Sequence, residues 1–162
     1  MTKEKTHTIV MLVEDQPGVL TRIAGMFARR GFNIDTITVG KTTKEGVSKM
    51  VITVLGDDST LEQVEKQVNK LIDVIKVIEM PADKSVIREL CLLKVAIPNK
   101  KAKEEILRYT KIYKTKIVDI NTKSVTAELI GVPDKIDAFI DLMKQFGIKE
   151  ISRTGVTAVS RG

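Results

Sequence analysis

The stretch from Glu14 to Ile34 constrains the fold more than any other part of the chain. It reads in order as a strand end, a helix start, an amphipathic helix, a helix stop and a second strand. Within the expected helix, four apolar residues follow Val19 at spacings of one, four, seven and eight, which places all five on a single helix face. These residues are Val19, Leu20, Ile23, Met26 and Phe27. We expect this face to pack against a sheet, and Arg22 to point away from it.

Asp15 and Pro17 mark the expected start of this helix. The Asp15 carboxylate can accept a hydrogen bond from the first turn, and a proline there loses nothing because that N–H has no helical partner. We therefore expect a helix over residues 17–30, beginning near Gln16, with Gly31 as its left-handed stop. The free N–H groups of the first turn carry about half a positive charge, which suits a carboxylate or a phosphate.

Gly18 and Asn33 have two interpretations. A side chain at position 18 would crowd any group that approaches the first turn, and the amide of Asn33 can both donate and accept hydrogen bonds. The alternative is that Asp15 is only a cap, Gly18 only a helix-start residue and Asn33 only a loop residue. From spacing alone, the structural interpretation is the more common one.

The composition is that of a globular protein. The chain has 162 residues, of which 43% are hydrophobic and 30% charged, enough for one domain or two small ones. No apolar stretch approaches the roughly 20 residues needed to span a bilayer, and the polar N-terminus lacks a signal-peptide core. The single cysteine, Cys91, excludes an intramolecular disulfide and lies in an apolar run. We expect a cytoplasmic protein with no membrane partner.

Hydrophobic periodicity predicts the same element order twice. The first half is expected to run strand, helix, strand, strand, helix, strand over residues 7–13, 17–30, 33–40, 47–55, 60–71 and 74–80. Pro81 lies among polar residues and indicates a boundary. The second half repeats the order over residues 87–97, 101–113, 116–120, 124–130, 133–146 and 148–159.

The expected fold class is therefore α+β, with two ferredoxin-like βαββαβ sandwiches in tandem, residues 1–80 and 81–162. Both alternating faces of residues 9–13 and 50–55 are largely apolar, although a sandwich of this kind leaves one sheet face open. The open face or edge needs a partner, and a homodimer is the economical solution.

A basic segment runs from Lys100 to Lys116, where seven basic residues meet two acidic ones. A solvated helix face is the usual explanation, because apolar residues keep their own helical stripe at Ala102, Ile106, Tyr109 and Tyr113. Docking of a partner protein or binding of nucleic acid are the alternatives. No helix-turn-helix is evident, and only the two tyrosines could stack on bases.

The sequence offers no catalytic or metal-binding set. His7 is the single histidine and Cys91 the single cysteine, so neither a zinc-type ligand set nor a paired nucleophile and base can be assembled. We expect a protein without catalysis or a metal of its own.

Two runs resemble the signature of the ACT domain, a small amino-acid-sensing module. They are Glu14-Asp15-Gln16-Pro17-Gly18-Val19-Leu20 and Arg29-Arg30-Gly31-Phe32-Asn33-Ile34. The resemblance extends through residues 37–39, 62–77, 88–90, 155–156 and 160–162. Taken together, these segments resemble the small regulatory subunits of acetolactate synthase (acetohydroxyacid synthase), and they cover nearly the whole chain.

The resemblance implies a regulatory subunit in the biosynthesis of branched-chain amino acids. Such a subunit binds a large catalytic subunit, which holds thiamine diphosphate, FAD and Mg²⁺, and raises its activity. It also implies feedback inhibition by valine or a related amino acid, with no cofactor in this chain. An amino-acid-responsive nucleic-acid-binding or transcription-regulating ACT protein, using the basic segment, is the alternative.

The resemblance also implies an effector site between two ACT domains of a homodimer. Its residues would be Asp15, Gln16, Pro17, Gly18, Val19, Leu20, Asn33 and Ile34. The effector carboxylate would meet N–H groups near Gly18, and Asp15 and Asn33 would bind its ammonium group. Many family members have Asn at the position of Asp15. A carboxylate there would repel that of the effector unless it pairs with the ammonium group.

Overall fold

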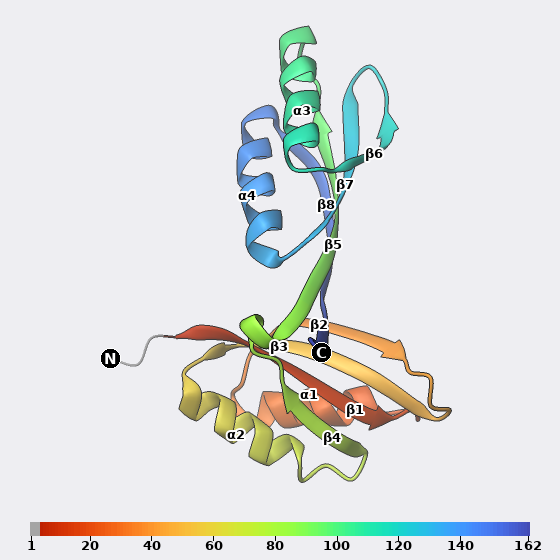
Figure 1. The fold of residues 1–162 in the computed structure, drawn as a ribbon, viewed down its shortest axis with the longest axis vertical. Coiled ribbons are helices and arrows are strands. Elements are labelled where there is room, and N and C mark those ends of the chain that lie inside the picture. Colours follow the sequence, from red (N-terminus) through yellow and green to blue (C-terminus); the bar gives the residue numbers. More distant parts are fainter. Residues whose placement is uncertain (1–3) are drawn as a thin grey trace. The chain divides into compact units, whose positions relative to one another are not determined.

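The computed structural model describes residues 4–162, which form two four-stranded sheets with two α-helices each (Figure 1). The first half contains β1 (Lys5–Glu14), α1 (Val19–Arg30), β2 (Ile34–Lys41), β3 (Val47–Gly56), α2 (Asp58–Val68) and β4 (Val74–Glu79). A short 3-10 helix (Ala82–Lys84) leads to the second half. That half contains β5 (Ser85–Ala96), α3 (Lys100–Ile112), β6 (Lys116–Ile120), β7 (Ser124–Gly131), α4 (Pro133–Met143), a 3-10 helix (Lys144–Phe146) and β8 (Ile148–Ser160).

The strand orders are β2-β3-β1-β4 and β6-β7-β5-β8, and the paired strands run antiparallel. The predicted fold class, two ferredoxin-like βαββαβ sandwiches, is therefore confirmed. In the first sheet, β2 and β4 are the edge strands, and each edge carries backbone groups that no further strand within the sheet pairs with.

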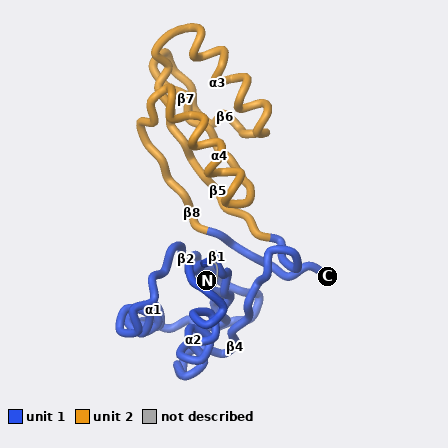
Figure 2. Tube along the Cα trace, turned by 90° about the vertical axis from the view of Figure 1, so that its left-hand side faces the viewer, with its two compact units in different colours: residues 1–86, 156–162 blue, residues 87–155 orange. Residues whose placement is uncertain are grey.

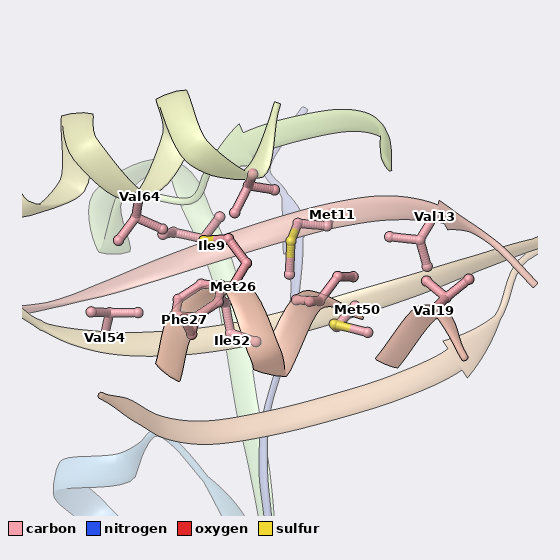
Figure 3. Close-up of a cluster of buried hydrophobic side chains, with 12 residues drawn as sticks. Ile9, Met11, Val13, Val19, Met26, Phe27, Met50, Ile52, Val54 and Val64 are labelled. Carbon is pink, nitrogen blue, oxygen red and sulfur yellow. The ribbon is translucent and has the colours of Figure 1, made fainter. Parts of the chain in front are cut away.

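Helices α1 and α2 cover one face of the first sheet and enclose a mostly aliphatic core (Figures 1 and 3). Ile9 pairs with Ile52 and Met11 with Met50, so the side chains of both strands point to the same face. Four of the five residues of the predicted α1 stripe pack on them, but Leu20 is 50% exposed, so its expected place on the core face was wrong. The buried members of this cluster are Ile9, Met11, Val13, Val19, Ile23, Met26, Phe27, Met50, Ile52, Val54, Val64 and Val68.

The opposite face of this sheet is buried as well. Val10 pairs with Val51, and the two side chains are only 1% and 2% exposed. Residues 156–162 belong to the same compact unit, and the ammonium group of Lys49 donates to the Ala158 carbonyl. Because the chain's own C-terminal segment contacts this face, the apolar residues there do not require a second copy. That part of the argument for a homodimer was wrong.

The chain divides into two compact units, which Figure 2 shows in blue and orange. Unit 1 comprises residues 1–86 and 156–162, and unit 2 comprises residues 87–155. Strands β5 and β8 each contribute residues to both units. Unit 1 is therefore not one continuous stretch of sequence.

Unit 2 has its own core beneath α3 and α4. The predicted stripe of α3 is confirmed, since Tyr109 packs against Phe146 and Tyr113 against Phe139. Cys91 is fully buried, and burial raises the pKa of its thiol, so it acts as a small apolar residue. Both tyrosine rings contribute to this core.

A buried ion pair crosses unit 2. Glu89 has a side chain only 1% exposed, and both its oxygens accept hydrogen bonds from Arg153, at 2.8 Å from Nε and 2.9 Å from Nη2. The remaining Nη1 of Arg153 donates to Asp137 at 2.6 Å. Hydrogen bonding to Glu89 raises the pKa of Arg153, so this guanidinium stays charged.

We expect Arg153→Met to destabilise the protein by about 3 kcal/mol, because it leaves the Glu89 carboxylate buried without its partner. Urea unfolding of the full chain measures this loss. Lys149→Met is the matched control, since Lys149 is exposed on the same strand. A loss no larger than that of the control would contradict the assignment.

Candidate functional site

Helix α1 begins at Val19, and its N-cap is Gly18 in the left-handed region, with φ 85° and ψ −9°. The predicted helix start at residue 17 with Asp15 as cap was wrong, because residues 16–18 form a turn that ends in this conformation. The Val19 N–H reaches the Gln16 carbonyl across the turn at 3.4 Å. Only glycine adopts such a φ without steric cost, which explains the glycine at this position.

Asp15 lies outside the helix, with its side chain exposed. Its backbone N–H donates to the Gly46 carbonyl at 2.9 Å, which fixes the turn against the hairpin between β2 and β3. Gln16 and Pro17 are exposed beside it. The Asp15 carboxylate is thus free to meet a ligand instead of the helix.

The first turn of α1 has backbone N–H groups without a helical acceptor. No side chain accepts a hydrogen bond at the Gly18 cap, and the first turn carries no acidic residue. The first helical bond of the turn runs from the Arg22 N–H to the Gly18 carbonyl at 3.0 Å, so the N–H groups of Leu20 and Thr21 have no helical acceptor. This terminus can therefore bind an anion.

Sequence reasoning missed Arg22 and Asp73. Arg22 points away from the core face of α1, as expected, but its guanidinium also pairs with Asp73 through two hydrogen bonds, Nε to Oδ2 at 2.6 Å and Nη2 to Oδ1 at 3.0 Å. The Asp73 side chain is only 8% exposed. The hydrogen bond from Arg22 lowers the pKa of Asp73 and the same bond raises the pKa of Arg22. Because 51 residues separate the two, no local pattern in the sequence indicates this pair.

The predicted site residues form two groups, residues 15–20 and residues 33–34, which do not meet within one chain. Gly18 and Asn33 lie at opposite ends of α1, whose 12 residues span about 18 Å. Asn33 is exposed, whereas Ile34 packs against the core of unit 1. Residues 15–20 therefore form one half of the predicted site, and Asn33 could contact the same ligand only from a second copy.

Apolar side chains remain exposed along β2 and the start of α1. Leu20 is 50%, Ile37 37% and Val39 49% exposed. Ile37 pairs with Ile52 and Val39 with Met50, so both point to the helix-covered face of the sheet. They lie on an edge strand, where another copy could add its own strand.

His7 and the acidic residues provide no further site. His7 is buried, its Nδ1 lies 3.5 Å from a Glu79 oxygen, and its Nε2 has no hydrogen-bond partner within residues 4–162. No group of three or more His, Cys, Asp or Glu in that range could hold a metal ion. Nor does any helix of the described chain have the length and apolar character needed to cross a membrane.

The basic helix α3 carries a surface hollow of about 430 Å³, lined by Lys101, Glu104, Glu105 and Arg108. Two acidic and two basic residues line it, so the hollow does not favour a polyanion. Tyr109 of α3 and Tyr113, which follows the helix, pack against the core of unit 2 and are not available for stacking on bases.

The βαββαβ fold with an uncapped glycine turn before α1 defines an ACT-type module. Residues 9–76 match the family described as the AHAS small subunit-like ACT domain, and residues 88–162 match the small subunit of acetolactate synthase. The chain belongs to the acetolactate synthase small-subunit family.

Individual relatives agree along nearly the whole chain. A probable acetolactate synthase small subunit of Methanothermobacter thermautotrophicus is 52% identical, over 97% of this chain and 94% of the relative. That of Archaeoglobus fulgidus is 53% identical, over 96% and 97%. The crystal structure of the Thermotoga maritima small subunit superimposes with a TM-score of 0.89 at 42% identity and covers 98% of each chain.

The lowered pKa of Asp73 predicts a pH dependence. Its folded pKa lies below the value of about 3.9 for a free Asp, so the stabilisation is present at neutral pH and is lost as pH falls through the folded pKa. We expect the difference in Tm between the wild type and Asp73→Asn to be constant from pH 7 to 5 and to shrink below pH about 4. A difference that does not shrink below pH about 4 would contradict the ion pair, and Asp83→Asn, at an exposed Asp, is the control.

Proposed function

We propose that this chain is the non-catalytic regulatory subunit of acetolactate synthase. It binds the large catalytic subunit, raises its activity and makes it sensitive to feedback inhibition by valine or a related branched-chain amino acid. The uncapped turn at Gly18, in a chain of this family, is the observation that carries the proposal. The proposed location is the cytoplasm.

The chemistry of the turn fits the head of an amino acid. A carboxylate can accept hydrogen bonds from the free N–H groups of Leu20 and Thr21, where the helix dipole also favours negative charge. Asp15 is exposed beside them and can pair with the ammonium group. A buried effector would therefore have both charges compensated, which burial of charged groups requires.

The proposed site needs two copies of the chain. A valine molecule is far shorter than the roughly 18 Å of α1, so Asn33 must come from the second protomer. The exposed apolar residues Leu20, Ile37 and Val39 supply a surface for that contact. Effector binding would then be coupled to the dimer, and a coupling of about 1–3 kcal/mol changes affinity several-fold or more.

The proposal assigns all redox and metal cofactors to the partner. Thiamine diphosphate, FAD and Mg²⁺ are expected in the catalytic subunit, and this chain contributes binding energy and effector sensing only. Its one histidine and one cysteine are both buried, which supports this division.

The decisive experiment is acetolactate formation by the purified cognate large subunit, with and without this chain, across a valine titration. We expect activation that valine reverses. Activation without reversal by valine, leucine or isoleucine would retain the partner and reject the effector site. No activation would reject the regulatory role.

We expect Gly18→Asp to abolish valine inhibition of the holoenzyme while the variant still raises activity. The new carboxylate would lie at the turn that binds the effector carboxylate, and the side chain is strained at a φ of 85°. Gly147→Asp is the matched control, because Gly147 in unit 2 has a φ of 92°. Valine inhibition retained in a folded Gly18→Asp holoenzyme would exclude this turn as the site.

A further inference from the structure

The guanidinium of Arg22 lies directly against Gly18. A Cβ placed on Gly18 would be 2.8 Å from Nη1 and 3.7 Å from Cζ of Arg22. The bare Cα of the glycine thus leaves room for the guanidinium, and a side chain at this position would have to displace it. A residue that holds the Arg22 guanidinium in place therefore also limits the space beside Gly18.

Asp73 is the residue that fixes Arg22. It accepts hydrogen bonds from Nε and Nη2, and this two-point geometry sets both the position and the plane of the guanidinium. Nη1, the third nitrogen, is left on the side of Gly18. A lysine could keep the charge of Arg22 but not this orientation.

Asp73 also holds the other end of the same turn. Its backbone carbonyl accepts a hydrogen bond from the N–H of Glu14, the last residue of β1, at 2.9 Å. Residues 14–18 are therefore held at their first residue by the Asp73 backbone and at their last by its side chain, acting through Arg22. The exposed side chains of Asp15, Gln16 and Pro17 lie between these two points.

We propose that Arg22 and Asp73 are positioning residues of the effector site, which hold the Gly18 turn in the conformation that presents its N–H groups and the Asp15 carboxylate to the amino acid. This inference rests on the proposed function. Without the pair, the backbone bonds of Glu14 and Asp15 still hold the start of the turn. Its Gly18 end loses the neighbouring guanidinium, and the effector must bear the cost of ordering that end.

The test uses the reconstituted holoenzyme with valine as the probe, and leucine and isoleucine alongside. The variants are Arg22→Gln, Asp73→Asn and the double variant. Three quantities are measured for each: the valine concentration for half-maximal inhibition, the activation without valine and the Tm of the full chain. We expect each single substitution to raise the half-inhibitory concentration at least tenfold. The double variant should raise it no further than the larger single effect, because the two residues act as one unit.

Arg29→Gln is the matched control. Arg29 lies seven residues after Arg22 on the same face of α1, and its Nη1 lies 3.2 Å from a Cβ placed on Gly25, so it repeats the contact between arginine and glycine. The described residues give Arg29 no ion pair. Its substitution should leave the half-inhibitory concentration unchanged.

Two outcomes would overturn the inference alone. One is a lower Tm with an unchanged half-inhibitory concentration in either single variant, which would show a purely structural pair. The other is multiplication of the two single effects in the double variant, which would show that the residues act independently. A wild-type holoenzyme that responds to none of the three amino acids would instead reject the proposed effector function, and this inference with it.

Discussion

Burial of both faces of the central strands β1 and β3 is the constraint on which unit 1 depends. The helices cover only the face that contains Ile9 and Ile52. Val10 and Val51 on the other face are equally buried, and the chain's last residues, held by Lys49 and Lys84, lie in the same compact unit. Removing the second half of the chain would therefore expose apolar sheet surface in the first, although the two halves repeat the same fold.

Much of this architecture could be predicted from alternation and helical spacing. The repeated βαββαβ order, the stripe of α1 and the stripe of α3 followed from periodicity, because each residue's face depends only on its neighbours in sequence. Periodicity shows that Val10 and Val51 are buried but not which segment covers them. Part of this face is contacted by residues more than a hundred positions away, as the bond from Lys49 to Ala158 shows, whereas a second copy was expected there.

The candidate site, too, could be predicted from the sequence only in part. The sequence pointed to Gly18 and to a helix start with free N–H groups, because glycine, proline and helix spacing act locally. It placed the cap at Asp15, however, because a carboxylate before a proline is a common helix start. The structure uses a left-handed glycine instead, beside a guanidinium held by Asp73, and such a long-range ion pair has no signature in a charge pattern. Local rules therefore located the turn but not what stabilises it.

The path of the chain indicates how a second copy would complete the site. β2 follows α1 and runs back along it, and the bond between Asp15 and Gly46 places the hairpin after β2 beside the Gly18 turn. If two β2 edges pair antiparallel about a two-fold axis, the start of one β2 lies next to the end of the other. Asn33 of one protomer then approaches the Gly18 turn of its partner. Such a pairing would satisfy, by one contact, both the exposed strand edge and the helix start without a cap.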